Sequence, residues 1–400
     1  MRVVLLRTKT KNDTLQKKKE KQMGKKHKHL FEQIISFDNI LKAYDKAAKG
    51  NRNTIKHLVF QEHLYTNLTL LQKRLVNGTY KHGDYECFKV FEPKERLISA
   101  LPFRDRVVQH ALHNYIAPIF NKVFYSCSYA CQPNKGTHKG VIDTQAAIRR
   151  LAKNGEVYYL KMDFSKYFHN IDKVVLFREI EKKITDKRVL KILQEFDGKE
   201  GKGIPIGNLM SQLYANIYGH IFDRFIKTKL KMTHYFRYMD DTVILSNDKE
   251  ELRRVFKILK RFSSLFLKMK FSKWYIDKVN VKPLNFLGYR ITESYKLIRK
   301  QSVLSAKRKI YKYVKAKDTL SLRRFIASWG GHIQWSDSHN LKIHIVKEII
   351  CSSESRMSVR DKISSCCRLK IKKSLKDILK EQLTKKETSQ NTQQTTSQKS

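Results

Sequence analysis

The sequence predicts an α+β fold in which a small antiparallel sheet is backed by helices. Three observations support this class. Apolar residues recur at helical spacing in several segments, and short runs rich in β-branched and aromatic residues lie between those segments. Turn residues such as Asn154-Gly155 separate the two kinds of segment, which alternate through residues 155–290.

The elements follow in chain order. Apolar residues from Val107 to Ile119 mark one helical face behind Pro102, and residues 157–164 have the composition of a strand. A long amphipathic helix is expected over 210–225, because apolar residues there recur at intervals of three and four behind a glycine-rich entry.

The second half of the chain continues the alternation. A hairpin is predicted over 235–245, and another helix over 252–262. Beyond residue 300 the sequence is mostly helical and basic, and Trp329 and Trp335 are interpreted as core anchors of that region.

The charge balance indicates the kind of partner. The 400 residues include 83 Lys and Arg but 37 Asp and Glu, which gives a formal net charge of +46. Such an excess repels itself unless a polyanion neutralises it, and nucleic acid is the commonest polyanion. Because 41% of the residues are hydrophobic, a wholly disordered basic tail protein is excluded. We therefore expect a folded protein that works on nucleic acid.

The sequence also excludes other classes of protein. No apolar run approaches the roughly 20 residues of a membrane span, so no membrane partner is expected. The six cysteines are too few for a disulfide scaffold, and Cys127 and Cys131 lack the second pair that a zinc site needs. A reduced, cytoplasmic protein is the expectation.

The two ends of the chain differ from its middle. Residues 1–30 hold eleven Lys and Arg against two acids, which predicts a basic arm that grips phosphates or, alternatively, only improves solubility. Residues 385–400 contain no apolar residue and predict a disordered tail.

Acids are scarce, so their placement in apolar strands is informative. Asp163 ends the strand predicted over 157–164, and Asp240-Asp241 stand at the turn of the predicted hairpin. Aspartate is depleted in strands and costs stability there unless it has a use. If the strands are neighbours, these carboxylates could hold two divalent cations about 3.5–4 Å apart for phosphoryl transfer. The alternative is that Asp240-Asp241 simply form a turn.

The residues around this turn carry a family resemblance. Tyr238–Asp241 (YMDD), with its flanking strands, resembles the signature hairpin of reverse transcriptases. Further segments resemble other motifs of that family, in family order across roughly residues 90–290. They are Lys94–Arg96 with Pro102–Gln109 (fingers), Leu160–Phe168 (first metal motif), Gly203–Leu213 (beneath the templating base) and Asn285–Tyr289 (primer grip). The resemblance implies a right-hand polymerase fold and an RNA-directed DNA polymerase.

The middle motif indicates the branch. Ile206-Gly207 and Ser211-Gln212 stand where most relatives have Gln-Gly and Ser-Pro, a form similar to the enzymes of diversity-generating retroelements. Two further segments, Ser128–His138 and Ser328–His332, also resemble that branch, whereas Leu284 departs from an expected glycine. The resemblance implies error-prone, adenine-mutagenic cDNA synthesis from a template-repeat RNA. Retron, group II intron-derived and antiviral abortive-infection enzymes remain alternatives, as does a catalytically idle nucleic-acid-binding protein.

The resemblance also implies residue roles at the metal site and the nucleotide. Asp163, Asp240, Asp241 and the carbonyl of Phe164 would bind two Mg²⁺ ions, with Mn²⁺ as a substitute. Phe168 would lie under the incoming sugar and exclude a 2′-hydroxyl by a clash.

The remaining roles concern the phosphates, the base pair and the primer. Arg96 and Lys94 would hold the triphosphate, with Lys89 as a substitute for Lys94. The base-pair surface and the primer grip would be formed by two sets: Ile206, Gly207 and Gln212, and Phe286, Leu287 and Gly288. Lys273 or Lys278 is a candidate proton donor to pyrophosphate.

The motif order predicts a division of the chain: a basic arm (1–30), fingers with N-terminal helices (31–155), a palm with the catalytic motifs (156–295), a helical basic thumb (296–384) and the tail (385–400). The expected partners are template RNA, a cDNA–primer duplex, deoxynucleoside triphosphates and a small multimeric accessory variability protein.

Overall fold

The computed structural model describes residues 26–91, 95–198 and 201–351, with side chains to residue 345. The chain divides into two compact units. The first contains residues 1–140 and 158–277, and the second contains residues 141–157 and 278–400. The predicted arm falls almost wholly outside the described residues, and the predicted tail falls entirely outside them.

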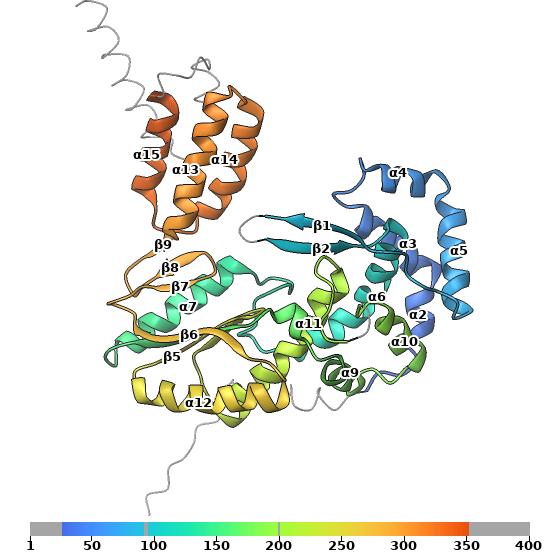
Figure 1. Cartoon of the computed structure of the whole chain (residues 1–400), viewed down its shortest axis with the longest axis horizontal. Helices are drawn as coiled ribbons and strands as arrows, with labels where there is room; N and C mark the ends of the chain where they lie inside the picture. The colour runs from blue at the N-terminus through green and yellow to red at the C-terminus, as the bar shows by residue number, and fades with distance from the viewer. Residues whose placement is uncertain (1–25, 92–94, 199–200, 352–400) are drawn as a thin grey trace, which may run out of the picture. The chain divides into compact units, whose positions relative to one another are not determined.

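The first unit combines N-terminal helices, a two-stranded sheet and a four-stranded sheet with its helices (Figure 1). Its N-terminal elements are α2 Phe31–Ile35, α3 Phe37–Ala48, α4 Ile55–Glu62, α5 Leu64–Val76, β1 Glu86–Val90, β2 Arg96–Ala100 and α6 Phe103–Asn121. The elements from residue 158 onward are β3 Tyr158–Phe164, α8 Tyr167–Asn170, α9 Lys173–Glu181, α10 Lys187–Glu195, α11 Leu209–Arg224, the π-helical turn η1 Phe225–Lys229, β4 Tyr235–Tyr238, β5 Asp241–Ser246, α12 Lys249–Phe266 and β6 Phe271–Lys278.

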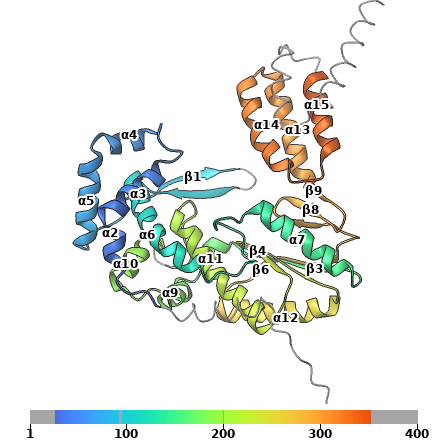
Figure 2. The ribbon, with the colours of Figure 1, turned by 180° about the vertical axis from the view of Figure 1, so that it is seen from behind.

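The second unit is a three-stranded antiparallel sheet with helices. Its elements are α7 Thr137–Ala152, β7 Leu284–Phe286, β8 Tyr289–Ile291, β9 Lys296–Ile298, α13 Lys300–Lys315, α14 Thr319–Ile333 and α15 His339–Cys351, seen from behind in Figure 2. Trp329 is buried as predicted. Trp335 is not a core anchor, because 39% of its surface is exposed just beyond the end of α14.

The predicted α+β class is confirmed, and the central sheet has the strand order β4-β5-β3-β6. The helices predicted over 107–119, 210–225 and 252–262 correspond to α6, α11 and α12. The predicted strand and hairpin correspond to β3 and to the antiparallel pair β4–β5. Among the described residues, no helix combines the length and the apolar character that a membrane span requires.

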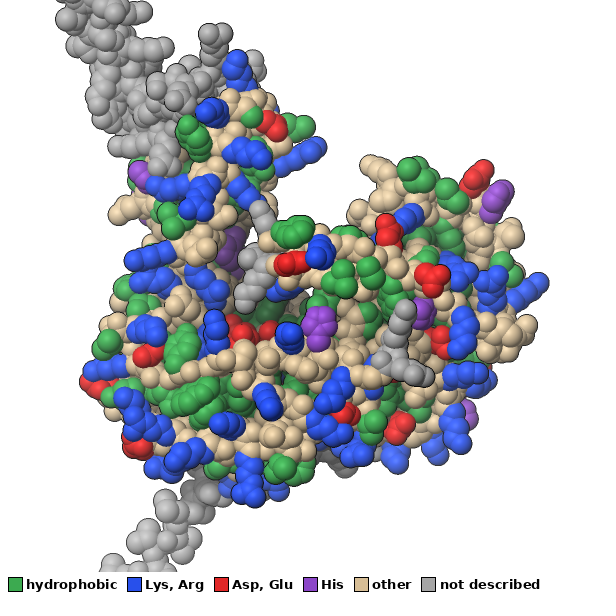
Figure 3. Space-filling view, viewed as in Figure 1, with side chains coloured by type: hydrophobic (Ala, Val, Ile, Leu, Met, Phe, Trp, Pro, Cys, Tyr) green, Lys and Arg blue, Asp and Glu red, His purple; other side chains and the backbone are tan. Residues whose placement is uncertain are grey.

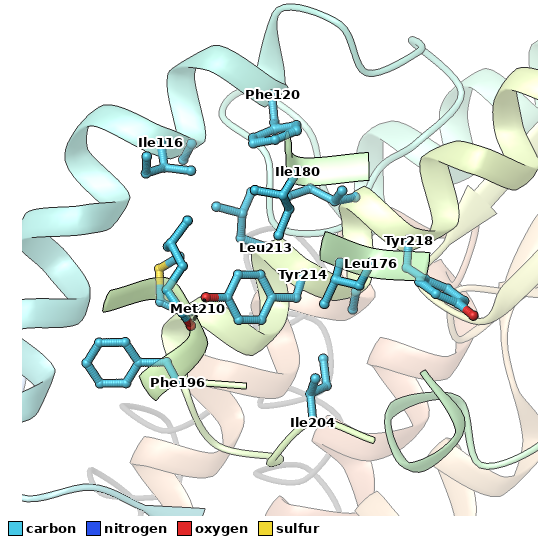
Figure 4. Close-up of a cluster of buried hydrophobic side chains, with 14 of the residues drawn as sticks. Ile116, Phe120, Leu176, Ile180, Phe196, Ile204, Met210, Leu213, Tyr214 and Tyr218 are labelled. Atoms are coloured by element: carbon cyan, nitrogen blue, oxygen red, sulfur yellow. Dashed lines mark hydrogen bonds between the residues drawn. The ribbon is translucent and has the colours of Figure 1, made fainter. Parts of the chain in front are cut away.

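Helix α11 is the central support of the first unit. It is buried almost all round, which is typical of a helix surrounded by protein rather than lying on the surface. Figure 4 shows Met210, Leu213, Tyr214 and Tyr218 of this helix among side chains of α6 and α9. The hydroxyl of Tyr214 donates to the Leu193 carbonyl at 2.7 Å, so this buried polar atom is satisfied.

Side-chain alternation along β3 separates the core from the face that carries the carboxylate. Leu160, Met162 and Phe164 belong to the hydrophobic core that also contains residues of α11 and α12. Successive side chains of a strand point to opposite faces, so Lys161 and Asp163 face away from that core. Lys161 and Asp163 therefore lie on the side of the sheet opposite α12.

Candidate active site

The strands that carry the candidate carboxylates are neighbours. β3 and β5 pair antiparallel, and their register places Asp163 directly opposite Asp241. Asp240 lies in the turn that joins β4 to β5, where Met239 adopts a left-handed φ of 54°. The chain thus brings Asp163 and the adjacent pair Asp240-Asp241, which begins 77 positions later, to one end of the sheet.

Two of these acids repel each other. Burial and the negative charge of Asp163 raise the pKa of Asp240 to about 6. Ser272, on β6, donates its hydroxyl to a carboxylate oxygen of Asp163 at 3.3 Å. The amide of Phe164 donates to the Asp240 carbonyl at 3.4 Å. A divalent cation beside Asp163 and Asp240 would offset this repulsion.

The third carboxylate, Asp241, is paired with a lysine side chain of the same protein. Asp241 forms an ion pair with Lys161, and both side chains are largely buried. No group of three His, Cys, Asp or Glu residues among those described is arranged to hold a metal ion. The donors are nevertheless hard carboxylate oxygens, which suit Mg²⁺ or Mn²⁺. Binding by all three would require Asp241 to exchange Lys161 for the metal.

The turn that carries Asp240 is supported from beneath by Arg237. This side chain is fully buried and forms a two-pronged ion pair with Asp223 of α11, at 2.6 and 2.8 Å. It also donates to the Ser128 hydroxyl at 3.0 Å and to the Met239 carbonyl at 3.2 Å. Arg237 therefore connects α11 to the residue that precedes Asp240.

The segment at Ser128, which resembles the retroelement branch, contributes to this support. The Arg237 amide donates to the Cys127 carbonyl at 2.8 Å, and the Tyr129 amide donates to the Arg237 carbonyl at 3.0 Å. Residues 127–129 thus hydrogen-bond to β4 at its outer edge and hold Arg237 in place.

Gly219 provides the space for this guanidinium. A Cβ atom at Gly219 would lie 2.5 Å from Cζ of Arg237, far inside van der Waals contact. Both groups are buried, so neither can move into solvent. The arginine therefore requires glycine at this turn of α11.

The residues around the expected nucleotide site come from β2, from α8 and from the segment that precedes α11. The Ser99 amide of β2 donates to the Ile206 carbonyl at 2.7 Å. Gly207 has a φ of +117°, and a Cβ there would lie 2.8 Å from Ile98 Cγ2, so only glycine suits this position. Phe168 is half-buried, and its carbonyl accepts from the Ile204 amide at 2.9 Å.

Two of the candidate triphosphate ligands, Lys89 and Arg96, lie on the two-stranded sheet. Arg96 is exposed at the start of β2, opposite Val90. Lys94 lies outside the described residues, and Lys89 forms an exposed ion pair with Glu95 at 2.8 Å. Gln212 is exposed on the first turn of α11.

The two candidate proton donors differ in their surroundings. Lys278 pairs with Glu156, whereas Lys273 is exposed on β6 close to Ser272. The pairing of Lys278 favours Lys273 as the candidate.

The expected primer grip belongs to the second unit. Leu287 and Gly288 form the turn between β7 and β8 with φ values of 54° and 89°, as a two-residue hairpin of type I′ requires. Phe286 is fully buried beside this turn. The hydroxyl of Tyr289 donates to the His332 carbonyl at 2.8 Å, so the Ser328–His332 segment supports the turn from α14.

Sequence reasoning missed Lys161, Asp223 and Arg237. The signal that identified Asp163 was present for all three, because each is a charged residue inside an apolar strand or helix. The sequence alone does not show which charged residue pairs with which.

Comparison with known proteins identifies a family, two curated relatives and a similar solved structure. The family model described as "Reverse transcriptase (RNA-dependent DNA polymerase)" matches residues 81–291. The chain is 23% identical over 186 residues to Protein YkfC of Escherichia coli, covering 43% of this chain and 48% of that protein. It is 28% identical over 151 residues to the group II intron-encoded protein LtrA of Lactococcus lactis, covering 35% of this chain and 24% of LtrA.

The chain thus spans about half the length of YkfC and about a quarter of LtrA. Among solved structures, telomerase from Candida albicans in complex with a telomeric RNA fragment has a TM-score of 0.44 at 12% identity. That comparison covers 76% of this chain and 60% of the telomerase chain.

We predict that Gly219→Ala slows catalysis. The new methyl group displaces Arg237 and removes its contact with the Met239 carbonyl, so kcat should fall by about 10²-fold, as for a misplacement of about 1 Å, with a smaller change in KM. Steady-state primer extension measures both constants. Gly331→Ala is the control, because it is also a helical glycine but has open space around it. Equal kcat values for the two variants would contradict the supporting role of Arg237.

A second prediction concerns the ion pair of Lys161 with Asp241. Lys161→Met should lower stability in EDTA by about 1.5–3 kcal/mol, since Asp241 loses a charged hydrogen-bond partner. The increase in thermal midpoint on adding Mn²⁺ should then exceed that of the wild type, because the metal no longer competes with the lysine. Lys187→Met, at an exposed site, serves as control. An equal Mn²⁺ increment in all three proteins would refute the competition.

Proposed function

The chain belongs to the reverse transcriptase (RNA-dependent DNA polymerase) family, and on this premise we propose that it synthesises cDNA on an RNA template by two-metal nucleotidyl transfer. The observation that carries the proposal is the register of β3 and β5, which places Asp163 opposite Asp241 with Asp240 in the adjoining turn. Its substrates are template RNA, a primer duplex and deoxynucleoside triphosphates.

The metal ligands proposed are Asp163, Asp240, Asp241 and the carbonyl of Phe164. Mg²⁺ is the expected ion, with Mn²⁺ as a substitute. When bound, the two ions lower the pKa of the primer hydroxyl and stabilise the leaving oxygen. The chain itself orients the ligands, because Arg237 fixes the Met239 carbonyl and Ser272 hydrogen-bonds Asp163.

The residues proposed to contact the incoming nucleotide come from three parts of the chain. Arg96 offers a two-pronged fork to the triphosphate, and Lys94 adds a point charge. Phe168 lies under the sugar, where its ring occupies the space of a 2′-hydroxyl. The backbone link between Ser99 and Ile206 favours this arrangement, because it connects the strand of Arg96 to the surface proposed for the base pair.

We assign the parts of the right hand as the motif order suggests: fingers over 31–155, palm over 156–295 and thumb over 296–384, of which residues 352–384 lie outside the description. Phe286, Leu287 and Gly288 form the proposed primer grip. The tight turn at Leu287-Gly288 supports that role, since it places these two residues at the tip of the β7–β8 hairpin.

Within the family, we propose that the chain is the enzyme of a diversity-generating retroelement. Such an enzyme copies a template-repeat RNA with errors at adenine and works with a small multimeric accessory protein. Ile206 and Gln212 carry this proposal. Isoleucine offers an apolar surface but no hydrogen-bond donor or acceptor, so a mispositioned base pair leaves no polar group unsatisfied.

The second candidate is an enzyme of the group II intron type. The similarity to LtrA favours it. Retron and abortive-infection enzymes share the chemistry proposed here. Copying fidelity distinguishes the retroelement candidate from the others.

Asp240→Asn should abolish primer extension on RNA while leaving RNA affinity intact. One of two mutually repelling acids becomes neutral, so the thermal midpoint in EDTA should stay equal or rise. Asp45→Asn, at an exposed position on α3, is the control for the lost charge. Extension at the wild-type rate by Asp240→Asn would refute the catalytic assignment.

Ile206→Gln should reduce errors opposite template adenine more than errors opposite the other bases, because the amide restores a polar check on the base pair. Sequencing cDNA made on a defined RNA by wild type, Ile206→Gln and Gln212→Pro measures this. Equal error rates at adenine in all three proteins would remove the retroelement proposal and leave the group II type in place.

A further inference from the structure

A basic groove lies between α12 and β6, the edge strand of the central sheet. Five cations line it: Lys249, Arg253, Arg254, Lys257 and Lys260. Residues 249–260 of α12 cover about 16 Å along the helix axis, at about 1.5 Å per residue. Figure 3 shows Lys and Arg side chains gathered over the region of α12, so this face is strongly positive.

Neighbouring acids neutralise only part of this charge. Arg253 pairs with Glu250, and Arg254 pairs with Asp248 at 3.2 Å. Within the described residues, those two ion pairs leave the ammonium groups of Lys249, Lys257 and Lys260 uncompensated in the groove. The groove therefore attracts a polyanion.

An aromatic platform lies in the same groove. Trp274 of β6 stacks on Phe256 of α12 with ring centroids 3.8 Å apart and 23° between the planes. Phe256 is buried, whereas 49% of Trp274 is exposed. An indole that is backed by a second ring and open to solvent suits the stacking of a nucleic-acid base.

The groove is separate from the carboxylates. Leu160 and Met162 of β3 face the core that contains Leu252 and Leu259 of α12, whereas Asp163 faces the other way. Trp274 packs on Phe256 and so lies on the α12 side of the sheet. RNA bound here would not be the strand copied at Asp163 and Asp240.

We propose that this groove binds a single-stranded RNA segment outside the polymerase cleft. A base stacks on Trp274, and phosphates contact Lys249, Lys257 and Lys260. The combination of cations with an exposed aromatic ring favours single-stranded nucleic acid over an acidic protein, because base stacking gives Trp274 a role that charge alone does not. The site goes beyond the proposed polymerase activity and would anchor an RNA that extends past the copied region.

The test keeps the polymerase cleft occupied. The full chain is saturated with a short RNA–DNA primer–template duplex, and a fluorescent, unstructured 12-nucleotide RNA is then titrated by anisotropy at several salt concentrations. The double variant Lys257→Glu/Lys260→Glu should bind this RNA at least tenfold more weakly. The slope of log K against log salt should fall by about 1.4, at about 0.7 for each lost phosphate contact. Trp274→Ala should weaken binding about tenfold, whereas Trp274→Phe retains most of the affinity.

Lys187→Glu/Lys191→Glu on α10 is the matched control, because it reverses two exposed lysines on another helix and changes the net charge equally. Thermal midpoints verify the fold of each variant. Equal weakening by the groove and control pairs would overturn the proposal in favour of general electrostatics. Unchanged RNA affinity with a changed oligomeric state in the groove variants would overturn it in favour of a protein interface. Primer extension by the wild type is measured separately, so failure of the polymerase proposal is distinguishable.

Discussion

The guanidinium of Arg237, enclosed with Asp223 beneath the β4–β5 turn, is the contact on which the candidate active site depends. Removing two charges from water is costly, and such a pair is tolerated when additional hydrogen bonds satisfy the remaining polar atoms. Here Ser128, Tyr235 and the Met239 carbonyl supply those bonds. Because these groups come from α11, β4, the turn and the segment near Cys127, one buried ion pair fixes the position of four pieces of chain.

The acids near this ion pair form a negatively charged region in a chain whose formal net charge is +46. Asp163 and Asp240 are held close enough to repel, and Asp241 is balanced by Lys161. The fold stabilises this concentration of negative charge with core packing on the opposite face of β3, where Leu160 and Met162 are fully buried. Under the proposed function, such a site sacrifices stability for the ability to hold cations, which is the usual relation between stability and function.

Much of this arrangement could be predicted from the sequence, because it depends on local pattern. The apolar spacing of α11 and the strand composition of β3 identify those elements, and Asp163 and Asp240 are conspicuous as acids in apolar surroundings. The pairing of Arg237 with Asp223 could not be predicted, because spatial proximity between a strand and a helix is set by tertiary packing. The same limit explains Trp335, whose apolar character suggested burial but whose position beyond α14 leaves it exposed.

Gly219, Asp223 and Arg237 have a consequence for how this chain can change over generations. A larger residue at position 219 collides with the guanidinium, and loss of Arg237 alone leaves Asp223 as an unpaired buried charge. Single substitutions at any of the three are therefore expected to be deleterious, whereas a buried ion pair can in general be replaced as a unit by well-packed apolar residues. The trio should be inherited as a block, and recombination between related genes that separates residue 223 from residue 237 should yield defective offspring more often than crossovers elsewhere.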